Sequence, residues 1–131
     1  MEITTLPPEH IAITQAWEEK LAALQVDSDE WTGSAEQLHN TRLVWTKIKQ
    51  KANDTALAPS CGINEYGSAY LSWALEGTQA LIRIKENNIF SWFFSCASTD
   101  KYCMHYSCGL REIDEFIDNL CEFFAHRLQQ P

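Results

Sequence analysis

Three successive stretches between Ser68 and Cys96 alternate apolar and polar residues, and this period of two restricts the fold more than any other feature. The stretches read "SAYLSWALE", "QALIRIKE" and "IFSWFFSC", separated by short turn signals at Gly77-Thr78 and Asn87-Asn88. Because successive side chains on a strand point to opposite faces, each stretch predicts a strand with one buried face. "STDK" predicts another turn, and "YCMHYSC" follows as a fourth strand. The sequence thus predicts a four-stranded antiparallel meander.

Helical spacing occurs on both sides of this meander. A first helix is expected after Pro7-Pro8, ending by Val26, because apolar residues then recur three and four positions apart. Ser34 and Gln37 form a capping-box pattern that starts a second helix. After Gly109, "LREIDEFIDNLCEFFAHRL" carries an apolar stripe opposite its acidic residues. The predicted fold class is α+β: two N-terminal helices, the meander, and a C-terminal amphipathic helix packed on the sheet.

The length of 131 residues suits a single domain, with 45% hydrophobic residues to form a core. We expect a helical part over residues 1–53, a loop over 54–65, and the sheet plus closing helix over 66–131. The two leading helices are expected either to cover the second sheet face or to pack beside the first. Leu81, Ile89 and Phe93 point to that second face, so we do not expect it to be fully exposed to solvent.

Charge and cysteine content limit the classes of partner. The formal charge is −8, which disfavours direct binding to nucleic acid and favours a basic protein partner. No apolar run approaches the ~20 residues that span a bilayer, so no membrane association is expected. The start of the chain lacks a signal-peptide pattern, and five cysteines are an odd count that suits a reducing compartment. We therefore expect a cytoplasmic protein, of a bacterium or a phage-infected host cell.

The segment "KYCMHYSC", Lys101 to Cys108, raises the question of a metal or nucleophile site. On a regular strand, Cys103 and His105 share one face with Ser107, whereas Cys108 points to the other face with the remaining side chains. That division conflicts with a zinc site built from Cys103, His105 and Cys108, even with Cys96 as a fourth ligand. We interpret these cysteines as small buried hydrophobic residues. A Cys- or Zn-dependent enzyme built on them stays as a less favoured hypothesis.

No other pattern points to catalysis. The chain has no phosphate-binding glycine loop, nucleophile elbow or H-E-x-x-H motif. Four basic residues lie on the second predicted helix, and we interpret them as a solvated surface: Arg42, Lys47, Lys49 and Lys51. We expect no catalytic residue, no bound metal and no cofactor.

The leading hypothesis is a non-enzymatic protein that binds a larger, basic protein and blocks a functional surface on it. Acidic residues would attract the partner, and exposed aromatic residues would supply affinity. The expected partner-binding residues are Asp27, Asp29, Glu30, Trp31, Glu112, Glu115, Asp118 and Glu122. Tyr66, Tyr70 and Phe93 are further aromatics that belong either to such a surface or to the core.

The pattern from Gly67 to Phe124, "GSAYLSW…ALIRI…IFSWFF" followed by an acidic helix, resembles several small bacterial and phage proteins. In size and charge the chain is similar to phage anti-CRISPR proteins and to toxin-immunity proteins, and this resemblance implies an inhibitor of a larger protein. Acidic type III secretion chaperones are also similar in size, acidity and α+β content. This resemblance leaves a homodimeric chaperone as an alternative function. In that family one helix usually precedes the sheet, whereas two are expected here.

Overall fold

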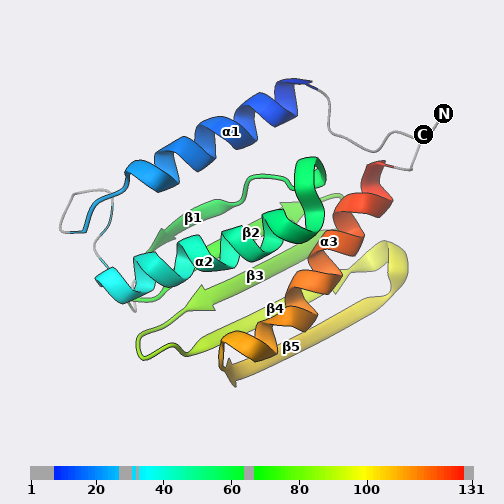
Figure 1. Cartoon of the computed structure of the whole chain (residues 1–131). Helices are drawn as coiled ribbons and strands as arrows, with labels where there is room; N and C mark the ends of the chain where they lie inside the picture. Colours follow the sequence, from blue (N-terminus) through cyan, green and yellow to red (C-terminus); the bar gives the residue numbers. More distant parts are fainter. Residues whose placement is uncertain (1–7, 27–30, 32, 64–66, 129–131) are drawn as a thin grey trace.

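The computed structural model describes residues 8–26, 31, 33–63 and 67–128. These residues form three α-helices and a five-stranded antiparallel sheet, which confirms the predicted α+β class (Figure 1). The helices are α1 (Pro8–Ala23), α2 (Ala35–Ala52) and α3 (Asp114–Leu128). The strands are β1 (Ser60–Ile63), β2 (Ala69–Leu75), β3 (Thr78–Ile84), β4 (Phe90–Cys96) and β5 (Lys101–Cys108).

The strands lie in the sheet in the order in which they occur in the sequence. The predicted meander corresponds to β2–β5, but the expected number of four strands is wrong. The segment Ser60–Ile63, which we assigned to a loop, pairs with β2 as β1, with Cys61 opposite Leu71. Only four residues long and containing Gly62, β1 is too short to show an alternation that can be distinguished from a loop.

The capping box at the start of α2 is confirmed. The Ser34 hydroxyl accepts a hydrogen bond from the Gln37 backbone N–H at 3.1 Å, and the Ser34 N–H donates to Gln37 Oε1 at 2.9 Å. Gln37 is buried, and its Nε2 also donates to the carbonyls of Gly67 at 2.8 Å and Ile84 at 3.1 Å. The same side chain therefore starts the helix and ties it to the sheet.

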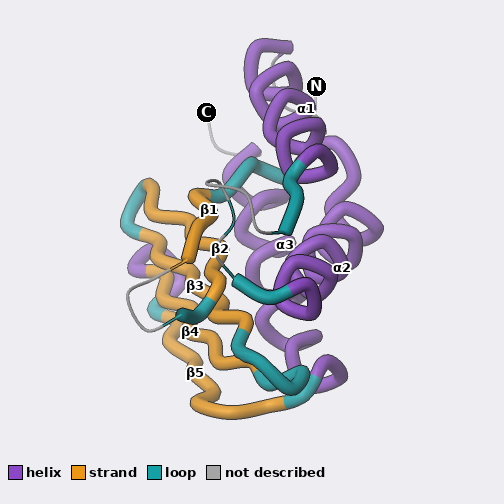
Figure 2. The backbone as a smooth tube through the Cα atoms, turned by 90° about the vertical axis from the view of Figure 1, so that its left-hand side faces the viewer, coloured by secondary structure: helices purple, strands orange, loops and turns teal. Residues whose placement is uncertain are grey.

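All three helices lie on one side of the sheet, as the views in Figures 1 and 2 both show. The leading helices thus lie on the same sheet face as α3, with α2 beside α3, and do not cover the second face. The core forms between this helical layer and the alternating buried residues of the strands. Phe116 of α3 packs against Trp73 and Trp92, with ring centroids 6.2 and 5.7 Å apart.

The basic residues of α2 hold the helical layer together. Lys47 forms an ion pair with Asp114 of α3 at 3.0 Å, and Lys51 pairs with Asp118. On the opposite side Lys49 lies 3.8 Å from Glu18 of α1. The Arg42 guanidinium donates to the carbonyls of Leu21, Ala22 and Leu24 at the end of α1, satisfying acceptors that a helix C-terminus leaves free. These cations therefore connect α2 to its neighbouring helices.

Candidate functional site

The cysteine and histidine of β5 are arranged differently from the regular strand that we expected. Trp92 pairs with His105 and Phe90 with Cys108, so Ser91 of β4 is opposed by two residues of β5, Tyr106 and Ser107. This β-bulge inserts one extra residue and reverses the alternation beyond it. Cys108 therefore faces the helices together with Cys103 and His105, and our prediction that it points to the other face is wrong.

Sharing a face does not make these side chains a metal site. Within the described ranges, no group of three or more His, Cys, Asp or Glu side chains is placed to hold a metal ion. Cys103 and Cys108 are half-buried against the core. Burial and the nearby Glu112 carboxylate raise the pKa of Cys108, and the Trp92 indole N–H offsets this only in part. A raised pKa keeps the thiol protonated, which opposes a nucleophilic role.

Trp31, the predicted aromatic anchor, is not available to a partner. It is only 1% exposed, and its Nε1 donates to the Ser34 carbonyl at 3.1 Å. The indole packs into the core at the start of α2, so the assignment of Trp31 to a binding surface is wrong. Asp27, Asp29, Glu30 and Tyr66 lie outside the described residues.

The four predicted acids at the C-terminal end of the chain are exposed on the helical layer. Asp118 pairs with Lys51, and Glu122 lies 3.7 Å from Lys101. Glu112 and Glu115 have no ion pair within the part of the chain that the structure describes. The acids therefore face solvent, but on the opposite side of the sheet from its exposed aromatic residues.

Those aromatic residues lie on the sheet face that none of the described helices covers, which we call the open face (Figure 2). Its side chains, from the strand registers and the alternation, are Ser60, Tyr70, Ser72, Ala74, Gln79, Leu81, Arg83, Ser91, Phe93, Ser95, Tyr102, Met104, Tyr106 and Ser107.

The open face carries three of the six large apolar side chains that the described residues expose. Tyr102, Met104 and Tyr106 are 63%, 41% and 78% exposed, and all three lie on the edge strand β5. The Tyr102 and Phe93 rings lie 6.1 Å apart, which extends the patch onto β4. Leu81 and Phe93 are half-buried, as expected for a face that is partly shielded from water. Alternation alone places Tyr102, Met104 and Tyr106 together, but their exposure follows from the position of the helices.

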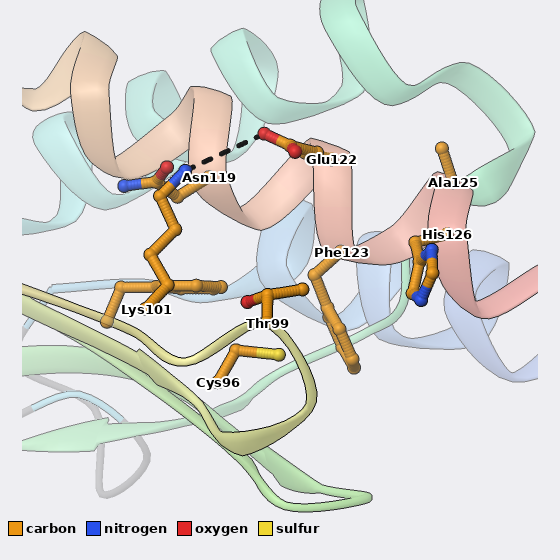
Figure 3. Close-up of a pocket in the computed structure, with 9 residues that line it drawn as sticks. Cys96, Thr99, Lys101, Asn119, Glu122, Phe123, Ala125 and His126 are labelled. Atoms are coloured by element: carbon orange, nitrogen blue, oxygen red, sulfur yellow. Dashed lines mark ion pairs between the residues drawn. The ribbon is translucent and has the colours of Figure 1, made fainter.

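A second candidate site lies on the helical side, where the end of β4 meets α3. A cavity of about 250 Å³ is lined by Phe94, Cys96, Thr99, Lys101, Asn119, Glu122, Phe123, Ala125 and His126. Figure 3 shows the Cys96 sulfur between Phe123 on one side and, on the other, the Lys101 side chain, which extends from the neighbouring strand toward Glu122. Apolar rings thus form part of the wall, and charged and amide groups form the rest.

Hydroxyl groups surround the Cys96 sulfur. Thr78 Oγ1 donates to it at 3.2 Å, and Ser98 Oγ lies 3.3 Å away. Burial disfavours the thiolate, but hydrogen bonds from Ser98, Thr78 and Thr99 outweigh it and lower the pKa of Cys96 to about 6. Burial instead raises the pKa of Cys61 and Cys121 to about 11. Cys96 is thus distinguished from Cys61 and Cys121 by its hydrogen-bond donors.

Comparison of the chain with protein-family models, with curated proteins and with solved structures finds no match. In the ranges that the structure describes, the helices lack the combination of length and apolar character that crossing a bilayer requires.

Proposed function

We propose that this chain is a non-enzymatic binding protein that docks through the open face onto a basic surface of a larger protein. Occupying that surface would block the partner's function, as an anti-defence or toxin-immunity inhibitor does. We place this interaction in the cytosol, where the five cysteines remain reduced. The observation that carries the proposal is the row of exposed Tyr102, Met104 and Tyr106 on β5.

Tyrosine and methionine are enriched at the centres of protein interfaces. Tyrosine provides a large rigid contact area with a hydroxyl that tolerates water. Here these side chains adjoin Phe93 and Leu81, so that apolar atoms continue across three neighbouring strands. A contiguous exposed apolar patch of this kind marks an interaction surface more often than a solvated one.

The size of the open face suits a standard interface. Strands about 4.8 Å apart, with about 3.4 Å per residue, give roughly 500 Å² of flat area for this five-stranded sheet. Side-chain relief and the surrounding turns enlarge this area toward the ~800 Å² that each partner buries in a typical complex.

The acidic turns around the open face and the net charge of −8 favour a basic partner, whereas the face itself carries one positive charge. The open face contains one charged residue, Arg83, and no acid, whereas exposed acids lie in the adjoining turns at Glu86 and Asp100. An apolar centre with a charged rim is the usual organisation of a protein interface. The acids of α3 lie on the far side of the sheet and add to the overall negative potential, which steers a basic partner over long range.

The test compares the Tyr102→Ala/Tyr106→Ala double variant with Ile13→Ala as a matched control. Ile13 is 62% exposed on α1, so it loses a similarly exposed apolar side chain away from the open face. Proteins captured from the native host are identified by mass spectrometry, and the purified partner is titrated against each variant. We expect the double variant to bind at least about 30-fold more weakly, and the control to bind as the wild type does.

Salt dependence tests the electrostatic part of the proposal. Binding is expected to weaken steeply with added salt, and on charge reversal of Glu112, Glu115, Asp118 and Glu122. A partner whose affinity is unchanged in the double variant would overturn the docking surface. Sedimentation of the purified chain tests whether a second copy of the chain occupies the open face. A dimer that the double variant abolishes would assign the face to self-association instead.

A further inference from the structure

Strand β5 is exposed on both faces and along its outer edge. It is the last strand of the sheet and pairs only with β4, and none of the described segments lies beyond it (Figure 1). Tyr102, Met104 and Tyr106 are exposed on the open face, and His105 is exposed on the helical side. The strand contains no proline, and apart from His105 its only basic residue is Lys101 at one end. Such an edge offers free backbone N–H and C=O groups for pairing with another strand.

The positions of β5 are symmetric about Met104. Tyr106 and Ser107 together oppose one residue of β4, so they count as one position of the strand. The eight residues of β5 therefore occupy seven positions, with Met104 in the middle. A second copy of the chain that pairs antiparallel about Met104 matches β5 over its whole length. Tyr102 then lies opposite Tyr106 of the second copy on the open face, and aromatic pairs of this kind stabilise paired strands.

This pairing brings four metal-binding side chains together on the helical side of the sheet. Cys103 lies opposite His105 of the second copy, and His105 lies opposite Cys103 of the second copy. Both residues face the helical side, because their partners in β4 are the buried Phe94 and Trp92. Directly opposed side chains on one face lie about 5 Å apart, and diagonal neighbours about 7–8 Å. Two thiols and two imidazoles thus meet around the two-fold axis, within reach of one ion.

The side chains of Cys103 and His105 are available for this role. Cys103 is a half-buried free thiol. Within the part of the chain that the structure describes, neither side chain makes a hydrogen bond or an ion pair, and His105 contacts the Trp92 ring with centroids 6.4 Å apart. A single chain supplies two ligands at this place, fewer than a structural metal site needs. The second copy completes the set.

We propose that two copies of the chain bind one zinc ion at this two-fold axis, through Cys103 and His105 of each copy. Two cysteines and two histidines are a tetrahedral ligand set that structural zinc sites use. Each Cys103 thiol releases its proton when it binds the ion, and the imidazoles bind in their neutral form. The two thiolates balance the two positive charges of zinc, so the site needs no further counter-ion.

The ends of the paired strands are complementary in charge. Lys101 lies opposite Cys108 of the second copy, and the Glu112 carboxylate lies close to Cys108 and Gly109 of its own chain. Glu112 has no ion pair within the described residues of one chain, so the pairing brings a cation to it. Lys101 also lies 3.7 Å from Glu122 of its own chain and would bridge acids of both copies. The two symmetric contacts add a modest attraction to that of the metal.

The first experiment measures zinc content and mass together. The full-length chain is stripped of metal with EDTA and sedimented with and without added zinc chloride. We expect a monomer without zinc, and with zinc a dimer that holds one ion per two chains. Renewed addition of EDTA should return the monomer. One zinc ion per monomer, or a mass that does not respond to zinc, would overturn the proposal.

Single substitutions test the ligands. Cys103→Ser and His105→Ala should each weaken zinc-dependent dimerisation at least about 100-fold, because each removes two of the four ligands of the dimer. Cys108→Ser is the matched thiol control on the same strand, and His39→Ala, exposed on α2, is the matched imidazole control. Both controls should dimerise as the wild type does, with unchanged circular dichroism in all four variants. An equal loss in Cys108→Ser would place the ion within one chain and contradict the shared site.

A cross-link tests the register. Met104→Cys places two thiols directly opposite each other at the two-fold axis, so a short bis-maleimide should join residue 104 of one copy to residue 104 of the other in the presence of zinc. Peptide mapping identifies the linkage. Gln79→Cys, exposed on β3 of the same open face, should stay unlinked. Failure of Met104→Cys to link to itself, or equal linkage through Gln79→Cys, would refute pairing about Met104.

The zinc site does not rest on the proposed docking function, and a last measurement separates the two. Tyr102→Ala/Tyr106→Ala keeps all four ligands, so it should still bind one zinc ion per two chains. Docking is measured in EDTA, where the chain is expected to be a monomer. Loss of zinc binding in this double variant would show that the metal does not hold the dimer through Cys103 and His105, whatever the docking result.

Discussion

The low pKa of Cys96 predicts a pH dependence of stability that one substitution should remove. The thiol pKa falls from 9.0 to about 6 because hydroxyl hydrogen bonds outweigh burial. Each tenfold change in an ionisation equilibrium is worth about 1.4 kcal/mol, so the folded thiolate adds about 4 kcal/mol to the free energy of unfolding. This contribution is complete above about pH 9, where the unfolded thiol is also ionised.

The sign follows from the lower pKa in the folded state. Between about pH 6 and about pH 9 the unfolded chain binds a proton that the folded chain does not, so stability rises with pH. The expected slope from this one group is about 1.4 kcal/mol per pH unit. As the pH falls through about 6, the folded thiol is protonated as well and the contribution is lost.

Urea denaturation under reducing conditions, repeated across this pH range, measures the slope. Cys96→Ser is expected to lose it, whatever its absolute stability, because only the Cys96 titration has been removed. Cys103→Ser is the control and should keep the wild-type slope. Parallel wild-type and Cys96→Ser curves would refute the assignment of a stabilised thiolate to Cys96.

Three further results are expected from urea denaturation. Gln37→Met should lower the free energy of unfolding by about 2–4 kcal/mol, because it leaves the backbone carbonyls of Gly67 and Ile84 without their donor. The control Gln79→Met, at an exposed position, should change the free energy of unfolding by less than about 0.5 kcal/mol. Trp31→Ala should cost about 3–5 kcal/mol, since the indole is buried. Above about pH 9 the wild type should lose stability, because Cys61 and Cys121 have raised pKa values and burying them as thiolates is unfavourable; the Cys61→Ser/Cys121→Ser double variant should lose less.

Local sequence patterns predicted the elements whose determinants are local. The alternation from Ala69 to Cys96 located β2–β4 because their buried residues face one helical layer. The Ser34–Gln37 capping box located the start of α2, because both of its hydrogen bonds are made within one helical turn. Such signals need no knowledge of the tertiary structure.

The wrong assignments depend on contacts between distant parts of the chain. Trp31 lies in the polar stretch "DSDEWTGS", which suggests exposure, but its burial comes from packing into the core at the start of α2. The strand β1 is defined by pairing with β2 and not by its own four residues. The exposure of Tyr102 likewise depends on all helices lying on the opposite side of the sheet. The Cys96 cavity combines β4 and α3, whose lining residues are separated in sequence.

The bulge in β5 has the largest consequence for the candidate sites. Strand registers place Cys61 opposite Leu71, Cys103 opposite Phe94 and Cys108 opposite Phe90, three buried residues of the helical side, and Cys96 is itself buried there. Without the bulge, Cys108 would lie on the open face beside the exposed tyrosines. With it, every strand thiol faces the helices, and the apolar row of β5 contains none. The bulge therefore keeps the strand cysteines on the helical side of the sheet, away from the proposed docking surface.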